Sequence, residues 1–345
     1  MPTSRVSVII PVYNCERYIA DAIRSVQAQT HPPFEIIVVD DGSTDKTGAV
    51  VRACGTVKYL RQENRGEPAA RNLGIEHAAG DLIAFLDGDD LWTPDKLAVQ
   101  VPYLEEHPGY AMVYGDMTTF DDRGTIDESV KQRFHITFPE GNIFLPLFKE
   151  TLFGSGSVVV RKECFHKVGP FDESLLVGSD YEMWLRIARN FAVGYVDRPV
   201  LMYRQHSSMS TLNLGRALQD GMPWEVLVLT KILARYPAIP AECGWSVINQ
   251  RLAKPYACMG HTLLRVQDHA NARRMFSKAL RHWPTNKSYG LFYLATFARP
   301  SHLAAVRRIY GKLIRRVSEG KLIQGSKDKA GPKSRGINNE ERDRL

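Results

Sequence analysis

Two aspartates at the end of an apolar run are the first residues of this chain whose type and spacing suggest chemistry. Asp87 and Asp89 follow Ala84–Leu86 and precede Leu91–Pro94. Hard carboxylate oxygens are ligands that Mg²⁺ or Mn²⁺ prefers, and the phosphates of a substrate could complete the shell. The same spacing also occurs in solvated acidic turns. The position directly after a buried run favours the metal interpretation.

Polar residues also follow two earlier apolar runs. Tyr13 follows Val6–Val12, and Asp41 closely follows Phe34–Val39. Ligands of open α/β sheets bind beyond the carboxyl ends of the strands, so we expect these clusters to converge on the two aspartates in one cleft. Asp45, a little farther on, is interpreted as the cap of the next helix.

A regular alternation of strands and helices must position these clusters. Strand, turn and helix repeat twice within roughly the first sixty residues, and the strands are apolar on both faces. This pattern predicts a parallel sheet that is covered on both sides and connected by right-handed crossovers. Further strands are predicted at Val57–Arg61, Asp81–Leu86 and Ser157–Arg161, and helices at Cys15–Gln29, Pro68–Ala79, Pro94–Glu106 and Asp180–Asn190. The predicted fold class is α/β, with a mostly parallel sheet flanked by helices.

The pattern becomes mostly helical after Ser210, which predicts a domain boundary near residue 212. We expect an α/β domain over 1–212, a helical domain over 213–319 and a disordered basic tail over 320–345. One tetratricopeptide-like helix pair is indicated by the spacing of Tyr256, Gly260, Ala272, Phe276, Ala279 and Pro284. A single repeat cannot bury its own face, so this pair should pack on neighbouring helices.

The positive charge is confined to the end of the chain. Residues 301–345 hold 12 Lys or Arg against 5 Asp or Glu, which equals the whole formal excess of +7. This distribution disfavours a nucleic-acid-binding core and favours contact of the tail with an acidic surface. An apolar stripe within 303–317 is flanked by basic residues. Such a helix could lie on an anionic membrane face or dock on the helical domain, and both interpretations stay open.

Cysteine usage and hydropathy bear on location. Five widely spaced cysteines without a C-x-x-C pair predict free thiols in a reducing compartment. The first apolar run lacks the features of a signal peptide, and no later run reaches the length of a membrane span. The expected location is therefore cytoplasmic, with peripheral attachment at the inner face of the membrane as a further option.

Four segments occur in the order typical of family 2 glycosyltransferases. They are Val6–Asn14 (VSVIIPVYN), Val39–Asp45 (VDDGSTD), Gly66 followed by Ala70–Asn72, and Phe85–Asp90 (FLDGDD). The chain resembles an inverting glycosyltransferase of this family, with a GT-A domain and a C-terminal helical domain. The resemblance implies that a sugar moves from a nucleotide diphosphate sugar, with UDP-sugar preferred, to a hydroxyl. The acceptor would be a glycan, a polysaccharide precursor or a lipid-linked oligosaccharide.

The resemblance also implies which residues hold the donor. Pro11, Tyr13 and Asp41 would bind the nucleobase and ribose, because a tyrosine ring can stack on a base and a carboxylate can accept its N–H. Arg71 and Asp87 would belong to the same nucleotide site, since a planar guanidinium suits phosphate or carboxylate recognition.

Catalytic and metal-binding residues are implied in the same way. The segment Gly178–Arg186 (GSDYEMWLR) resembles the family's acidic motif before a helix, so Asp180 would be the general base; alternatively it caps that helix. Ser179 stands where the family more often has Glu. His206 would join Asp89 as a metal ligand, an arrangement that suits Mn²⁺ better than Mg²⁺. A lone histidine is more often structural.

Other functional classes fit the sequence less well. No G-x-G-x-x-G follows the first run and no P-loop is present, which argues against a dinucleotide oxidoreductase and a P-loop nucleotide-binding protein. A catalytically silent scaffold and a sugar nucleotidyltransferase stay open. The presence of both Asp89 and Asp180 speaks against the scaffold, and release of pyrophosphate would identify the nucleotidyltransferase.

Overall fold

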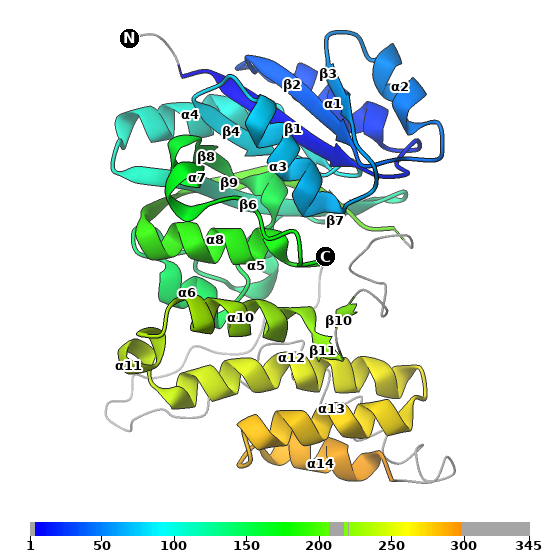
Figure 1. The fold of residues 1–345 in the computed structure, drawn as a ribbon, viewed down its shortest axis with the longest axis vertical. Helices are drawn as coiled ribbons and strands as arrows, with labels where there is room; N and C mark the ends of the chain where they lie inside the picture. The colour runs from blue at the N-terminus through cyan, green and yellow to red at the C-terminus, as the bar shows by residue number, and fades with distance from the viewer. Residues whose placement is uncertain (1–3, 207–216, 220, 298–345) are drawn as a thin grey trace, which may run out of the picture. The chain divides into compact units, whose positions relative to one another are not determined.

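A nine-stranded sheet organises the protein in the structure, a computed structural model that describes residues 4–206, 217–219 and 221–297 (Figure 1). Its strands are β1 Val6–Val12, β2 Glu35–Asp40, β3 Lys58–Arg61, β4 Leu82–Phe85, β5 Leu91–Trp92, β6 Tyr110–Asp121, β7 Gly124–Asp127, β8 Val159–Arg161 and β9 Ala192–Arg204. The strand order is β3-β2-β1-β4-β8-β6-β9-β5, and β7 pairs with β6.

The parallel pairing that the sequence predicts is confirmed for the first four strands. In the register, Val8 of β1 lies beside Ile36 of β2 on one side and Ala84 of β4 on the other, and β3 continues in parallel beyond β2. The later strands mix directions: β8 runs antiparallel to β4 and β6, whereas β6 and β9 are parallel. The fold class is α/β as expected, with an unbroken parallel run in β3-β2-β1-β4 and a second parallel pair in β6 and β9.

Helices cover both faces of the sheet, as continuous apolar strands require. The helices of this part are α1 Ile19–Gln27, α2 Thr47–Ala53, α3 Glu67–His77, α4 Lys96–Glu106, α5 Val130–Phe134, α6 Phe144–Lys149, α7 Glu163–Val168 and α8 Ser179–Asn190. Alternate residues of β1 face opposite sides, so Val8 and Ile10 pack in one core cluster with Ile19 of α1. Ile9 points the other way, where a Cβ added at Gly74 of α3 would lie 2.5 Å from its side chain.

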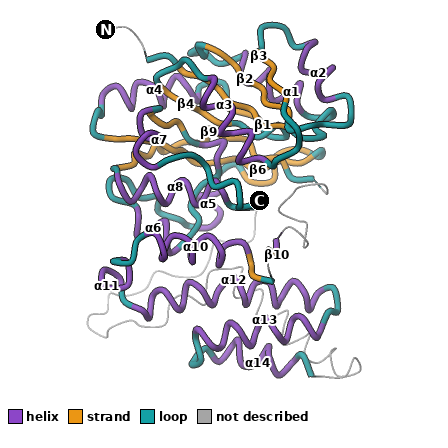
Figure 2. The backbone as a smooth tube through the Cα atoms, in the orientation of Figure 1, coloured by secondary structure: helices purple, strands orange, loops and turns teal. Residues whose placement is uncertain are grey.

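The chain after β9 is mostly helical, as predicted. It contains a small hairpin, β10 Leu218–Gln219 with β11 Met222–Pro223, and then α10 Trp224–Arg235, α11 Ile239–Cys243, α12 Trp245–Arg265, α13 His269–His282 and α14 Lys287–Ala295. Met1–Thr296 form one compact unit, and Figure 2 shows these helices stacked below the sheet region. The predicted boundary at residue 212 and the segments 298–319 and 320–345 lie outside the described residues.

The predicted helix pair is formed by α12 and α13. Its crossing depends on small residues: a Cβ at Gly260 would lie 2.9 Å from the ring of Phe276, and Ala272 and Ala279 are fully buried. The pair also packs on neighbouring helices. Contacts of α12 with α10 and of α13 with α14 cover the faces that a lone repeat would leave open.

Two further sequence expectations concern thiols and membrane spans. All five cysteines are free, as predicted. Every helix in the described part of the chain is too short or too polar to cross a bilayer.

Candidate active site

The loop after β2 is fixed by a buried aspartate. One carboxylate oxygen of Asp41 accepts hydrogen bonds from the side chain of Gln62 at 2.7 Å and from the backbone N–H of Arg65 at 2.9 Å, and the other accepts from the N–H of Gly66 at 2.8 Å. The backbone N–H of Asp41 donates to the carbonyl of Val12. Asp41 therefore ties the ends of β1 and β2 to the loop that leads into α3, a role the sequence did not indicate.

Neighbouring aspartates shape the same loop. Asp40 is fully buried and accepts from the N–H of Ser43 at 2.7 Å and from the hydroxyl of Tyr59 at 2.5 Å. Asp45 accepts from the N–H of Thr47, the first residue of α2, at 2.9 Å. The N-cap residue of α2 is Lys46, so the interpretation of Asp45 as the helix cap is wrong: its side chain binds the first N–H of the helix from one position before the cap.

The end of β1 presents an aromatic ring beside this loop. Pro11 is buried within the strand and lies opposite Val39, whereas Tyr13, just after the strand, is 43% exposed. Asn14 adopts a left-handed φ of 50°, and its side-chain oxygen accepts from the N–H of Thr44 at 2.8 Å. The β1 and β2 loops are therefore joined, with the Tyr13 ring open to a stacking partner.

Arg71 lies at the centre of a group of carboxylates. It is 2% exposed on α3 and pairs with Glu67 and with Asp87, the latter at 3.0 Å, while its guanidinium lies over the ring of Phe171. Burial opposes the charge, but Glu67, Asp87 and Asp180 raise the pKa of Arg71. Its buried Nε has no hydrogen-bond partner among the described residues, so this buried cation keeps an unused donor beside the carboxylates.

The carboxylates are not fully neutralised by this arginine. Burial, together with the charges of Glu67, Asp89 and Asp180, raises the pKa of Asp87, and Arg71 offsets only part of the effect. The side chains of Asp87 and Asp89 are each 34% exposed, so solvent and ligands reach both. Oxygen donors with excess negative charge fit a hard divalent cation.

The two residues predicted as metal ligands lie next to each other. Nε2 of His206 is 3.0 Å from a carboxylate oxygen of Asp89, and the imidazole packs against the ring of Tyr18. Backbone and side-chain N–H groups of Arg204 hold this contact, because they donate to Asp90 at 2.8 Å and to the Asp89 carbonyl at 2.7 Å. Within residues 4–206, 217–219 and 221–297, no three His, Cys, Asp or Glu side chains are grouped to hold an ion. A cation here would need further ligands from a substrate or water.

Arg204 is itself fixed by two aromatic rings. Its guanidinium lies 4.9 Å from the centre of the Tyr18 ring and 4.6 Å from that of Phe120, and the residue is 9% exposed. Stacking of this kind stabilises a desolvated cation. The end of β9 is therefore rigidly attached to the loop that carries Asp89.

Asp180 lies in the first turn of α8. One of its oxygens accepts a hydrogen bond from the hydroxyl of Ser155 at 2.9 Å. The N-cap residue is Gly178, and no side chain caps the helix, so the alternative that Asp180 is the cap is wrong. Glu182 does not replace the carboxylate missing at Ser179, because it is buried in an ion pair with Arg186 at 2.8 Å.

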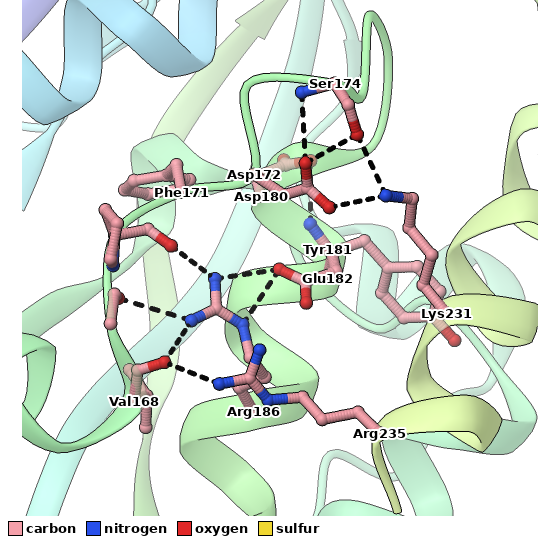
Figure 3. A network of polar contacts seen from close by, with 12 residues as sticks. Val168, Phe171, Asp172, Ser174, Asp180, Tyr181, Glu182, Arg186, Lys231 and Arg235 are labelled. Carbon is pink, nitrogen blue, oxygen red and sulfur yellow. Dashed lines mark hydrogen bonds and ion pairs between the residues drawn. The ribbon is translucent and has the colours of Figure 1, made fainter.

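A polar network joins α8 and α10 to the segment before Asp180 (Figure 3). Arg186 donates to the backbone carbonyls of Val168, Gly169 and Pro170. From α10, Lys231 contacts a carboxylate oxygen of Asp172 and the hydroxyl of Ser174, each at 2.8 Å. The network fixes the chain on both sides of Phe171, whose ring packs on Arg71.

Comparison with known proteins identifies the family. The sequence profile described as Glycosyl transferase family 2 matches residues 7–169. An uncharacterized glycosyltransferase of Rickettsia typhi is 36% identical over 220 residues, which cover 62% of this chain and 68% of that protein. The chain belongs to glycosyltransferase family 2.

Other relatives of this family member differ in length. TuaG of Bacillus subtilis, named for teichuronic acid biosynthesis, is 35% identical over 46% of this chain and 62% of its own. The chain spans about a third of the length of the first curated relatives it matches, which are Rickettsia proteins.

Solved structures support the fold. TarS of S. aureus superposes with a TM-score of 0.57 at 20% identity, over 85% of this chain and 53% of TarS. A shorter form of TarS in complex with UDP-GlcNAc gives a TM-score of 0.52 at 20% identity, over 85% of this chain and 89% of that one. The GT-A fold expected from the sequence is confirmed.

In this family 2 glycosyltransferase, the predicted residues fall into groups. Arg71 and Asp87 form one charged group, on which the charge of Asp180 also acts. Asp89, on the same loop as Asp87, forms a second group with His206, which follows β9. Pro11, Tyr13 and Asp41 end the neighbouring strands, although only Tyr13 is exposed.

Sequence reasoning missed two residues. No motif marked Ser155, which lies 25 positions before its partner Asp180. Arg204 lies two positions before His206, but the two rings that hold it, Tyr18 and Phe120, come from distant parts of the chain.

Proposed function

We propose that this chain is an inverting, metal-dependent glycosyltransferase that moves a sugar from a UDP-sugar to a hydroxyl acceptor. The observation that carries the proposal is the ion pair of Arg71 with Asp87 after β4, near enough to Asp180 for its charge to raise the pKa of both residues. A carboxylate able to take a proton thus stands beside a cation and carboxylates that can organise a diphosphate.

The reaction is a single displacement. Asp180 takes the proton of the acceptor hydroxyl, the hydroxyl oxygen forms a bond to the anomeric carbon, and the bond from that carbon to the diphosphate oxygen breaks. The nucleoside diphosphate departs with the bonding electrons, and configuration at the anomeric carbon inverts. The Arg71 guanidinium stabilises the charge that develops on the leaving group.

Asp89 and His206 would hold a Mn²⁺ or Mg²⁺ ion, and Asp87 would support it. The ion, when bound, neutralises charge on the diphosphate as a Lewis acid. The fit rests on the adjacency of Asp89 and His206 and on the carboxylates of Glu67, Asp89 and Asp180, which add to burial in raising the pKa of Asp87.

UDP-GlcNAc is the first donor to test, because TarS, which shares the fold, has been solved in complex with it. A polysaccharide precursor is the first class of acceptor, by analogy with the name of TuaG. Glycan and lipid-linked acceptors belong to the same proposal.

A donor screen tests the proposal. The purified chain is mixed with nucleotide sugars and Mn²⁺, binding is followed by thermal shift, and the products of UDP-GlcNAc turnover are identified with water as the acceptor. We expect a rise in Tm with UDP-sugars and release of UDP. Release of pyrophosphate from UTP and N-acetylglucosamine 1-phosphate, supplied in a parallel reaction, would show a nucleotidyltransferase instead. Binding of UDP-GlcNAc without turnover in either reaction, and with glycan acceptors added, would show a silent scaffold.

A further inference from the structure

The hydroxyl of Ser155 contacts the carboxylate of Asp180 from a buried 3₁₀ turn, Ser155–Ser157. Ser155 is 2% exposed, and its Oγ lies 2.9 Å from one oxygen of Asp180. The other oxygen accepts from the N–H of Tyr181 at 2.8 Å. Rotation of an aspartate carboxylate about its last torsion is only weakly restricted by itself. Hydrogen bonds at both oxygens therefore select one orientation of the group.

Three buried donors hold the turn itself. The indole N–H of Trp92 donates to the carbonyl of Gly156 at 2.9 Å, and the amide of Gln100 donates to the carbonyl of Ser157 at 2.9 Å. The amine of Lys96 lies 3.4 Å from the next carbonyl, that of Val158. Every backbone carbonyl that follows Ser155 in this stretch is thus bound from β5 or α4.

Lys96 is an unusual member of this set. It is fully buried, and burial lowers the pKa of its amine well below the ordinary lysine range. The amine also donates to the side-chain oxygen of Gln100 at 2.5 Å and lies over the Trp92 ring. A buried amine is costly unless its donors are used. The contacts with Gln100, Trp92 and the Val158 carbonyl offset the cost of burying the amine.

The donors follow the predicted metal-binding loop along the chain. Asp89 is three positions before Trp92. The segment from Asp87 to Gln100 therefore carries both the carboxylates predicted to face the sugar nucleotide and the side chains that hold the turn. The turn also packs on β9, since a Cβ at Gly156 would lie 2.6 Å from the side chain of Leu201. The candidate metal loop and Asp180 are therefore connected through the same buried turn.

We propose that Ser155 is a positioning residue for the transfer reaction: its hydroxyl orients the Asp180 carboxylate toward the acceptor, and Trp92, Lys96 and Gln100 hold the turn that presents it. This inference rests on the proposed function of Asp180 as the general base. The hydroxyl of Ser155 keeps its proton throughout and touches only the base.

Two serines of the same turn provide a matched comparison. Ser157 is also buried, but its hydroxyl donates to the carbonyl of Gly154 at 2.8 Å and not to Asp180. Turnover is measured as UDP release from UDP-GlcNAc with Mn²⁺ and water as the acceptor. We expect Ser155→Ala to lower kcat by on the order of tenfold, with KM for UDP-GlcNAc and Tm close to those of Ser157→Ala.

A third variant leaves the turn sequence unchanged. Trp92→Phe keeps an aromatic ring but removes the donor to Gly156, so kcat should fall with KM unchanged. It tests the same chain of contacts if Ser155→Ala folds poorly. In the Asp180→Asn background, Ser155→Ala should have no further effect on kcat, because the group that it orients no longer acts as a base.

The outcomes separate this inference from the proposed function. Equal kcat values for Ser155→Ala and Ser157→Ala, with Trp92→Phe at the wild-type rate, would overturn the role of Ser155 while Asp180→Asn is still inactive. Wild-type turnover by Asp180→Asn would overturn the proposed function itself, and the role of Ser155 with it.

Discussion

Carboxylates and arginines around the carboxyl end of β4 set the chemistry at the residue scale. Arg71 and Arg204 are both buried, and each contacts the loop of Asp87, Asp89 and Asp90. Burial and the neighbouring carboxylates raise the pKa of Asp87, and the charge of Arg71 offsets only part of this effect. A diphosphate would add further negative charge to the same place, so its binding should depend on an added cation.

The first prediction concerns that cation. Asp89→Asn should abolish the Mn²⁺-dependent part of UDP binding, measured by calorimetry, because Asp89 is the exposed carboxylate beside His206. The fold should be retained. Asp81→Asn is the control, since Asp81 adjoins the opposite end of β4 and is 61% exposed. Undiminished Mn²⁺-dependent binding by Asp89→Asn would remove the metal assignment.

The sequence predicted where the first strands end, but not which side chains contact one another there. Apolar runs such as Val6–Val12 coincide with β1 because both of its faces are buried, so Tyr13 and Asp41 could be placed at one edge of the sheet. The donors that occupy Asp41 lie 21 to 25 residues away, and only Gly66 among them belongs to a segment that marks the family. Tertiary contacts of this kind leave no local signal.

At the scale of elements, the long strands β6 and β9 were not predicted. They have 12 and 13 residues, and their pairing shifts register at Gly115, Asp116 and Met117. Each shift interrupts the alternation of buried and exposed residues on which strand prediction depends. Asp116 is buried there and binds the hydroxyl of Ser129, so a polar residue stands where the pattern would require an apolar one.

The start of α8 gives a prediction at the same scale. Gly178 has a φ of 79°, and an added Cβ would lie 2.3 Å from the Trp224 ring of α10. Gly178→Ala should therefore lower the free energy of unfolding through both backbone strain and overpacking. Gly55→Ala is the matched control, because Gly55 has a φ of 83° but no atom within 4 Å of the added Cβ.

The difference between these two glycines isolates the packing contribution. We expect Gly178→Ala to cost about 1 to 3 kcal/mol more than Gly55→Ala in urea unfolding. Equal losses of unfolding free energy would mean that α8 and α10 can move apart at little cost, and that α10 does not fix the turn before Asp180.

At the scale of the whole molecule, the excess positive charge lies at the C-terminal end of the chain. The first 300 residues hold equal numbers of acidic and basic side chains, and the excess of +7 belongs to residues 301–345, outside the described part. We propose that this segment binds an anionic membrane surface, where each basic residue contributes about 1 kcal/mol.

Liposome sedimentation tests that proposal. The full chain should sediment with anionic vesicles at low salt, added salt should weaken binding, and truncation after Pro300 should reduce it. Vesicles of neutral lipid are the control. A full chain that ignores anionic vesicles at low salt would assign the segment to the fold of the protein instead.

The central claim, that Asp180 is the base of a glycosyl transfer, is tested most directly by one comparison on Asp180→Asn. UDP binding by calorimetry and UDP release from UDP-GlcNAc are measured on the same preparations as the wild type, with Mn²⁺ present. We predict unchanged UDP binding and a loss of turnover of about 10²- to 10⁴-fold, because a base contributes to the rate without holding the donor. Turnover at the wild-type rate, or equal losses of binding and turnover, would contradict the claim.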